Sequence, residues 1–455
     1  MLAVLLTFIG VLIVLITEKV DKSALALIGA TIAGLIIYVS PHNAVHNPSE
    51  IITTPYLLKH LPWDTVMFIF AMMMVVSMAG QTGLFQWLAV KTIQATKGKP
   101  RTLYFALIFF TFGMSFFFDT VSTMLIIAPL TIEIMEILRK DFRPYLIAEA
   151  VVANFGSIPS LIGSVPNIVI GEKANITFIQ FLFVLGPVTV ILLLVSLPLL
   201  WMLHKNEING STGDDDEIDT RIFFLEADRV IKDQKMFAIS IIGIVILILG
   251  FTLGQILPGS ELPFGIPNPL PPNPFPAVLT ALTAMTFMLL AAGNKIKEML
   301  RELQWSTIYF IVGLLFIVQA MEELGLIEIA IQILEPLITD NQEFGTIIMV
   351  AIGWFLSGVV DNIPISAALA PIAVGIGGEQ SFLAMVLIFS VNVGGYVLPI
   401  SSPANILAIS FAEKRGSRIS FAQFAKVGTT LAVIHVVIGI ISFIILQPVL
   451  EPFLG

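Results

Sequence analysis

Residues 118–123 read Phe118-Asp119-Thr120-Val121-Ser122-Thr123, and residues 360–366 read Val360-Asp361-Asn362-Ile363-Pro364-Ile365-Ser366. Each stretch places an aspartate inside a long apolar block, and each block continues to an Ala-Pro pair, Ala128-Pro129 and Ala370-Pro371. An acidic residue near mid-membrane costs about 2.5–3.5 kcal/mol on insertion scales. Two such costs at matching positions indicate a functional site built from two related halves.

The composition around these stretches is that of a membrane protein. Of 455 residues, 57% are hydrophobic and 12% are charged, whereas a soluble domain has roughly 25% charged residues. Apolar blocks of about 20 residues are long enough to cross a bilayer as helices, and we predict an all-α polytopic protein with about 10–13 transmembrane elements. Met1 leads directly into the first block, which we therefore expect to be a retained helix. The absence of cysteine excludes disulfides and thiolate metal sites.

An internal repeat relates the two halves of the chain. The run from Trp63 to Ile69 recurs from Trp305 to Ile311, and Asp119 recurs as Asp361, both at an offset of 242 residues. Further matches follow in order at offsets close to this one, among them Gly83-Leu84 with Gly325-Leu326, Asn154-Phe155-Gly156 with Asn392-Val393-Gly394, and Asn167-Ile168 with Asn405-Ile406. Ordered matches at nearly one offset are much stronger evidence than single matches between apolar helices.

The repeat divides the chain into five predicted regions. These regions are an N-terminal helix with the start of a second helix (1–35), a first repeat (36–203), an acidic linker (204–235), an extra helix with a proline-rich loop (236–274) and a second repeat (275–455). The linker carries the acidic run from Asp214 to Asp219. The residues from Pro258 to Pro276 contain eight prolines, which lack the N–H that a helix needs.

The basic residues indicate that the two repeats are inverted. The segment 91–101 has four Lys or Arg residues, whereas its repeat equivalent, 333–343, has none; the loops 412–418 and 171–177 differ in the opposite sense. Cytoplasmic loops are enriched in Lys and Arg, so equivalent loops are predicted on opposite faces, as in inverted-repeat transporters. This places the linker 204–235 in the cytoplasm and both termini outside, in a cell inner or plasma membrane.

A second polar element in each half carries Gly, Pro, Ser and Asn within an apolar block. It runs from Asn154 to Asn167 in the first half and from Asn392 to Asn405 in the second. Gly and Pro unwind helices, and the freed carbonyls and amides bind ions near the bilayer midplane. We therefore predict a substrate and ion site made of Asp119, Thr120, Ser122, Thr123, Asn154, Ser157, Ser164, Asn167, Asp361, Asn362, Asn392, Ser401, Ser402 and Asn405, with sodium at Asp119, Asp361, Asn154 and Asn392.

At these residues the chain resembles the ion transporter superfamily, within its ArsB/NhaD group, which includes sodium/proton antiporters of the NhaD type, arsenite permeases and P-protein-type members and is related to citrate transporters. The motifs that carry this resemblance are Asp361-Asn362-Ile363-Pro364, Asp119-Thr120, Asn154-Phe155-Gly156 and the run from Ile162 to Ile168. The resemblance implies re-entrant hairpins and discontinuous helices in a transport domain beside a scaffold, an elevator-like movement and a homodimer.

The chain departs from that family at two positions. Thr120 stands where Asn often follows the first aspartate, and Ser164 stands where many members have Asp. Ser164 removes one carboxylate from the first half-site, which leaves an arsenite or oxyanion substrate open beside sodium.

The expected function is secondary active transport, since no Gly-x-x-x-x-Gly-Lys-Ser/Thr phosphate loop is present. The first expectation is cation (sodium)/proton antiport, and the alternative is an arsenite, oxyanion or carboxylate (citrate-like) permease coupled to protons or sodium. A channel and an intramembrane aspartyl protease are remote alternatives; neither aspartate has the Gly-x-Gly-Asp setting of such proteases. We expect no enzymatic activity and no cofactor beyond sodium or protons as coupling ions. The expected partners are the lipid bilayer and a small inorganic ion or anion, with no nucleic acid.

Overall fold

The computed structural model describes residues 1–17, 19–40, 42–45, 49–96, 99–209, 231, 233–256, 276–293, 296–301 and 303–454. Within these residues the protein is nearly all helical, and eight helices are long and apolar enough to cross a membrane. The predicted all-α polytopic fold is therefore confirmed. The acidic run from Asp214 to Asp219 and residues 258–275 of the proline-rich loop lie outside the described residues.

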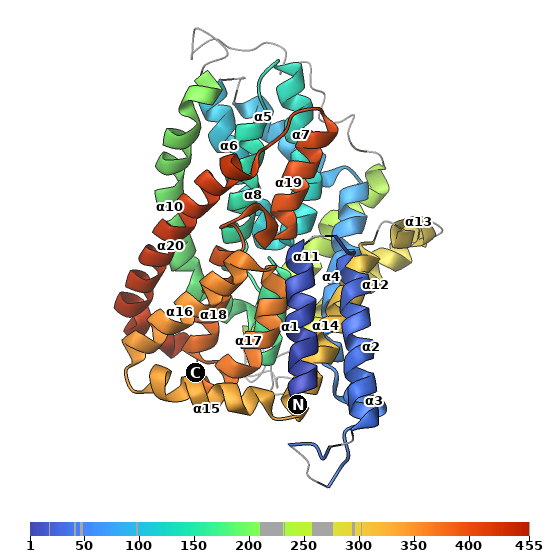
Figure 1. Ribbon diagram of the computed structural model, residues 1–455. Helices are drawn as coiled ribbons and strands as arrows, with labels where there is room; N and C mark the ends of the chain where they lie inside the picture. The colour runs from blue at the N-terminus through green and yellow to red at the C-terminus, as the bar shows by residue number, and fades with distance from the viewer. Residues whose placement is uncertain are drawn as a thin grey trace, which may run out of the picture.

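One side of the molecule is a group of six helices, which we call the six-helix group (Figure 1). It consists of α1 (Leu2–Thr17), α2 (Lys22–Val39), α4 (Trp63–Gln81), α11 (Gln234–Ile256), α12 (Ala277–Ala292) and α14 (Trp305–Glu323). The halves are interleaved here, because α2 packs on α14 and α12 packs on α4. Gly313 allows the first contact: a Cβ at this position would lie 2.7 Å from the backbone of Ala26. Small residues at such contacts let membrane helices approach closely.

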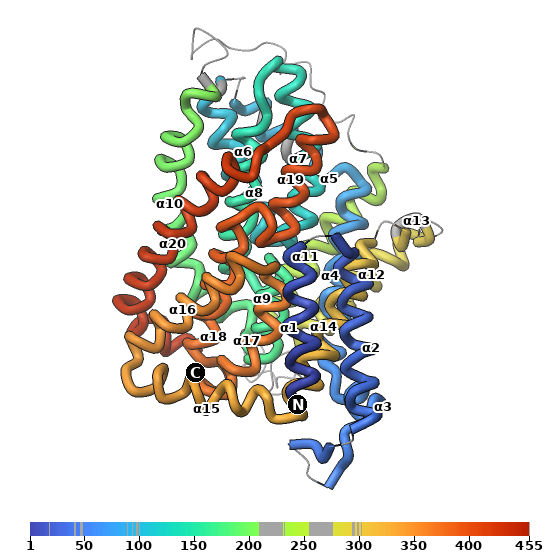
Figure 2. The backbone as a smooth tube through the Cα atoms, viewed as in Figure 1, coloured from blue at the N-terminus to red at the C-terminus, as the bar shows by residue number. Residues whose placement is uncertain are grey.

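The other side, here called the hairpin group, contains two re-entrant hairpins that enter from opposite ends of the molecule (Figures 1 and 2). The first descends through α6 (Pro100–Phe117) and returns through α7 (Thr120–Ile137). The second rises through α16 (Gln342–Val359) and returns through α17 (Asn362–Gly377). Both hairpin tips therefore reach the middle of the molecule. Irregular backbone at this depth is tolerated only where protein, and not lipid, surrounds it.

Two interrupted helices cross between the hairpins. The first is α8 (Arg143–Gly156) followed by α9 (Val165–Lys173), and the second is α18 (Phe382–Gly394) followed by the short turn η5 (Pro399–Ser401) and α19 (Pro403–Lys414). Each break falls on the Gly- and Pro-containing element that the sequence predicts. The long helices α10 (Phe178–Asn209) and α20 (Phe421–Leu450) cover the outside of the hairpin group.

Short helices connect these parts: α3 (Thr54–His60), α5 (Leu84–Ala95), α13 (Ile296–Arg301), α15 (Leu326–Thr339) and the terminal turn η6 (Glu451–Phe453). The helix α15 lies across the lower end of the molecule, near both chain termini (Figure 1).

Equivalent elements of the two halves run in opposite directions. The α5–α6 connection lies at the upper end of the molecule and its equivalent between α15 and α16 at the lower end, and α10 rises whereas α20 descends (Figure 1). Local geometry is nevertheless conserved between the halves, since the indole N–H of Trp63 donates to the carbonyl of Leu58 and that of Trp305 to the carbonyl of Leu300, both at 2.9 Å.

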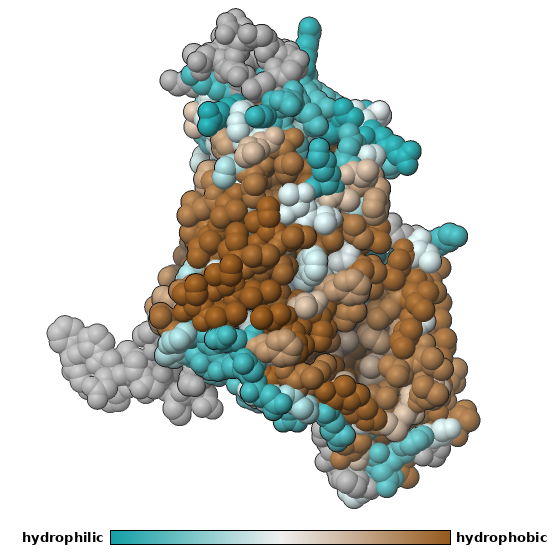
Figure 3. Space-filling view, turned by 60° about the vertical axis from the view of Figure 1, so that its left-hand side comes forward, coloured by the Kyte–Doolittle hydropathy of each residue, from teal (hydrophilic) through white to brown (hydrophobic). Residues whose placement is uncertain are grey.

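The surface shows where lipid surrounds the molecule. Apolar side chains form a broad band over one face, and polar side chains gather above it and along its lower edge (Figure 3). Large apolar side chains of the long helices α10 and α20, such as Leu194, Val437 and Ile445, are more than half exposed. Helices that satisfy their own backbone hydrogen bonds are the elements that can stand in hydrocarbon in this way.

Candidate functional site

The two predicted aspartates stand at the hairpin tips. Asp119 is the N-cap of α7, and its Oδ1 accepts hydrogen bonds from the N–H groups of Val121 and Ser122 at 3.0 Å each. Its Oδ2 accepts from the hydroxyl of Ser122 at 2.5 Å. Asp361 is the N-cap of α17, and its Oδ1 accepts from the N–H of Ile363 at 3.1 Å. Each carboxylate thus satisfies the first free amides of its own helix.

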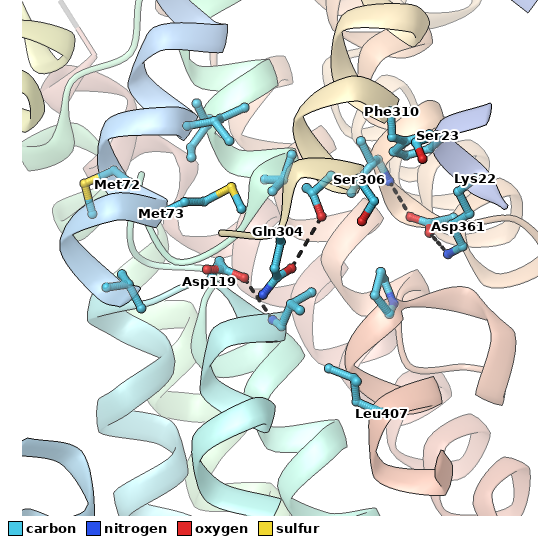
Figure 4. A pocket seen from close by; sticks show the side chains of 18 of the residues that line it. Lys22, Ser23, Met72, Met73, Asp119, Gln304, Ser306, Phe310, Asp361 and Leu407 are labelled. Atoms are coloured by element: carbon cyan, nitrogen blue, oxygen red, sulfur yellow. Dashed lines mark hydrogen bonds and ion pairs between the residues drawn. The ribbon is translucent and has the colours of Figure 1, made fainter. Parts of the chain in front are cut away.

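Both aspartates line one cavity of about 280 Å³ between the six-helix group and the hairpin tips. Asp361 is only 4% exposed, and Asp119 is partly buried. In Figure 4, Gln304 and Ser306 lie between the two carboxylates. The remaining wall is mostly apolar and includes Ile69, Met72, Met73, Val76, Ile162, Val165, Ile168, Phe310, Ile363, Ile406 and Leu407. The acids predicted from the repeat therefore share one low-dielectric space.

Lys22 also lines this cavity, and the sequence-based prediction missed it. Its Nζ donates to Oδ2 of Asp361 at 2.5 Å, which joins the six-helix group to the tip of the second hairpin (Figure 4). The lysine side chain is 30% exposed and the aspartate side chain 3% exposed. Asp361 therefore already holds a cation, which is an ammonium group tethered to α2.

A signal for Lys22 is present in the sequence. The helix α1 has 16 residues, which at 1.5 Å per residue is about 24 Å, and this is shorter than a hydrocarbon core of about 30 Å. A helix of this length can place the polar turn that follows it within the depth of the membrane. Asp21 in this turn caps α2 by accepting from the N–H groups of Ser23 and Ala24, both at 3.0 Å.

Four asparagines cross-link the two interrupted helices behind the cavity. Asn154 donates to the side-chain oxygen of Asn405 at 3.1 Å, and Asn392 donates to that of Asn167 at 2.6 Å. All four are fully buried. Each pair joins one half of the chain to the other, so the repeat symmetry is present at the level of single hydrogen bonds.

Two of these asparagines also donate to backbone carbonyls that the helix breaks leave free. The amide of Asn167 donates to the carbonyls of Ser157 and Ser160, at 2.8 and 2.7 Å. Asn405 donates to the carbonyls of Gly395 and Leu398 in the second half, at 2.8 and 3.0 Å. A buried carbonyl freed by a helix break needs a donor, and here a side chain supplies it.

The two halves differ at one pair of positions in this network. Ser164 donates to Oδ1 of Asn392 at 3.0 Å. The equivalent atoms of the other half, the hydroxyl of Ser402 and Oδ1 of Asn154, have no hydrogen-bond partner among the described residues. A Cβ at Gly395 would lie 3.1 Å from that Asn154 oxygen and 3.0 Å from Nδ2 of Asn362. The second half-site therefore retains two buried oxygens available to a ligand.

The remaining predicted residues lie around these two groups. Ser157 donates to the carbonyl of Asn154 at 2.7 Å, and Ser401 donates to the carbonyl of Gly358 at 2.6 Å. Thr120 and Thr123 are buried at the start of α7. The structure thus brings Asp119 and Asp361 together in the cavity, whereas Asn154, Asn167, Asn392 and Asn405 form the network behind it.

Solved structures of transporters share this fold. The Alcanivorax borkumensis YdaH transporter matches with a TM-score of 0.58 over 95% of this chain and 100% of its own, at 11% identity. Neisseria gonorrhoeae MtrF, described as one of a class of antimetabolite efflux pumps, matches with a TM-score of 0.56 over 94% of this chain and 95% of its own, at 13% identity. At such identities the likeness concerns the fold.

Sequence relatives extend over most of the chain. An uncharacterized transporter of Mycobacterium tuberculosis is 24% identical over 440 residues, which is 95% of this chain and 96% of that protein. The mouse P protein is 24% identical over 515 residues, 96% of this chain and 59% of that protein. The relationship to P-protein-type and citrate transporters predicted from the sequence is confirmed. A family model described as "Citrate transporter" matches residues 12–382, more than half of the chain, and this membrane transporter therefore belongs to the citrate transporter family.

Proposed function

We propose that this transporter exchanges sodium, or another small monovalent cation, for protons, and that Asp119 and Asp361 bind the two ions in turn. Three carboxylates (Asp21, Asp119 and Asp361) and one ammonium group (Lys22) line the cavity. With all four groups ionised, their formal charges favour a cation over an anion. A buried carboxylate that either binds a proton or pairs with a cation can exchange one for the other.

The capping geometry is the observation that carries this proposal. A free helix N-terminus is a ready site for an anion. Here the N-terminal amides of α7 and α17 already donate to Asp119 and Asp361 themselves. An incoming anion would meet carboxylates at both tips, whereas an incoming cation would meet carboxylate oxygens.

A carboxylate substrate such as citrate is the second candidate. The family to which the chain belongs favours it, and so does the ammonium group of Lys22, which faces the cavity from α2. Such an anion would have to enter with protons or cations that compensate its charge, since the cavity holds three acids.

We further propose that the hairpin group moves against the six-helix group during transport, in an elevator-like step. Among the described residues, two ion pairs connect the groups: Lys22 with Asp361 at the cavity, and Lys173 of α9 with Glu322 of α14 at 2.7 Å. A second cavity of about 260 Å³ lies beside the latter pair. Ion pairs that must separate for a domain to move can set which state is populated.

The proposed orientation follows from the basic residues. Lys99, Arg139, Lys140, Lys414 and Arg415 belong to the connections at the upper end of Figure 1. The positive-inside tendency supports a cytoplasmic upper end, a cytoplasmic linker 204–235 and external termini. A homodimer in a cell inner or plasma membrane stays part of this proposal.

The test is flux in proteoliposomes that contain the purified protein and a pH-sensitive dye. A pH gradient is imposed, and sodium, lithium, citrate or arsenite is then added. The proposal expects sodium or lithium to collapse the gradient in the wild type but not in the Asp361→Asn variant. Collapse by citrate with no response to sodium would establish the second candidate instead. An open conductance that does not saturate with substrate would indicate a channel.

A further inference from the structure

A second buried acid lies inside the hairpin group, away from the cavity. Glu149, in the middle of α8, is 1% exposed. Its Oε1 accepts a hydrogen bond from the hydroxyl of Thr131 on α7 at 2.6 Å, and its Oε2 has no hydrogen-bond partner among the described residues. The cavity between the two hairpin tips does not include it.

Further titratable side chains lie on the same helices. Tyr145 precedes Glu149 by one turn of α8, and its ring meets that of Tyr104 on α6 edge to face, with centroids 5.3 Å apart. The hydroxyl of Tyr104 is 2.8 Å from Nδ1 of His204 on α10. The Tyr145 hydroxyl and Nε2 of His204 have no hydrogen-bond partner among the described residues, although both side chains are at most 2% exposed.

The charged groups beyond this cluster lie nearer the surface. Glu207 of α10 and Lys426 of α20 are both exposed. Glu136 of α7 and Arg415 of α19 pair with each other at 2.8 Å, and both are about half exposed. Neither offers a counter-charge to Glu149, whose hydrogen-bond partner is the neutral hydroxyl of Thr131.

The other half of the molecule shows that packing does not require these polar groups. The repeat offset of 238 places Leu387 at the position of Glu149, and the offset of 242 places Ala373 at that of Thr131. Both residues are fully buried in α18 and α17. An apolar pair therefore fills the same place in the same fold, whereas an ionisable side chain inside a membrane is costly. A structural role leaves that cost unexplained.

We propose that Glu149 is a proton-binding site of the hairpin group, distinct from the aspartate pair. When the site releases its proton, the O–H bond of the carboxylic acid breaks and leaves the carboxylate. This inference rests on the proton coupling proposed above.

The experiment combines two readouts on protein in lipid. The first is the infrared difference spectrum produced by a change of pH, in which a carboxylic acid that gains or loses its proton shows its own carbonyl band. We expect Glu149→Gln to remove one such band, because Gln keeps the shape and the bond to Thr131 but cannot titrate. The matched surface variant Glu136→Gln and the cavity variant Asp361→Asn should retain that band. A spectrum of Glu149→Gln identical to the wild type would overturn the proposal.

The second readout is proton flux in proteoliposomes, where Glu149→Gln should lose proton-coupled flux and Glu136→Gln should retain it. If Glu149→Gln does not fold, the double variant Thr131→Ala/Glu149→Leu copies the packing of the other half and should fold, lack the band and lack coupled flux. Loss of the band in a protein with no sodium response would refute sodium antiport and leave the proton site standing. Sodium antiport with normal proton coupling in either variant would refute the proton site at Glu149 and leave sodium antiport standing.

Discussion

Replacing Lys22 with methionine tests the cavity most directly, because it removes the built-in cation while keeping an unbranched side chain of similar length. In the wild type, an incoming sodium ion must displace the ammonium group that lies 2.5 Å from Oδ2 of Asp361. Lys22→Met frees that oxygen. We therefore expect the sodium concentration for half-maximal transport to fall.

The size of the effect follows from the geometry. Unit charges about 4 Å apart interact with about 4 kcal/mol at the effective dielectric of about 20 that suits such sites. Lys22 is 30% exposed, and solvent screening of exposed pairs reduces this value to about 2 kcal/mol. A free-energy difference of about 2 kcal/mol is roughly thirtyfold in an equilibrium constant, which is the expected fall in the half-saturating sodium concentration.

The assay is sodium-dependent collapse of a pH gradient in proteoliposomes, measured over a sodium titration. Sodium should also raise the melting temperature of Lys22→Met more than that of the wild type, since a tighter ligand stabilises the folded state more. Lys22→Arg keeps the charge and should resemble the wild type. Lys173→Met removes a lysine that pairs across the two helix groups away from the main cavity and should leave sodium affinity unchanged. An unchanged or weaker sodium response in Lys22→Met would refute the reasoning.

Three further variants test the site and the packing of the hairpin group. Asp361→Asn should abolish coupled transport at normal expression, because Asn keeps the shape and removes the charge; full activity in the flux assay would contradict the assigned role. Gly428→Ala should lower the melting temperature, since its Cβ would lie 2.1 Å from the carbonyl oxygen of Tyr396 and overpacking costs about 1–3 kcal/mol; Gly113→Ala, which meets nothing within 4 Å, is the control. Asn167→Ala should also lower the melting temperature, because it strips two buried carbonyls of their donor, at about 1–3 kcal/mol each; an unchanged melting temperature would contradict that role.

The sequence predicts much of the fold because the repeat carries the information. Asp119 and Asp361 recur at one offset, and their N-cap positions at the hairpin tips follow from that recurrence. The asparagines are predicted as site residues, but their crossed pairing, Asn154 with Asn405 and Asn392 with Asn167, is not. That pairing depends on how the halves pack, which no local pattern encodes.

Lys22 escaped prediction for a different reason. The repeat comparison begins at Trp63 and therefore gives no equivalent for a residue of α2. A lysine between two apolar blocks also has the pattern of an ordinary interfacial turn, since lysines are common at helix ends. Its ion pair with Asp361 spans 339 positions of sequence, and the packing of α2 and α17 on α14 brings the two together.

The crossed packing of α2 on α14 and of α12 on α4 has a consequence for biosynthesis. A ribosome that has completed only the first half has made α2 and α4 without either partner, so neither half can reach its final contacts alone. The first half must wait in the membrane for the second, because the close fit of Gly313 to Ala26 can form only after α14 has been synthesised. Two fragments of a chain divided between residues 209 and 233 should therefore assemble when they are synthesised together, and each should be degraded when synthesised alone.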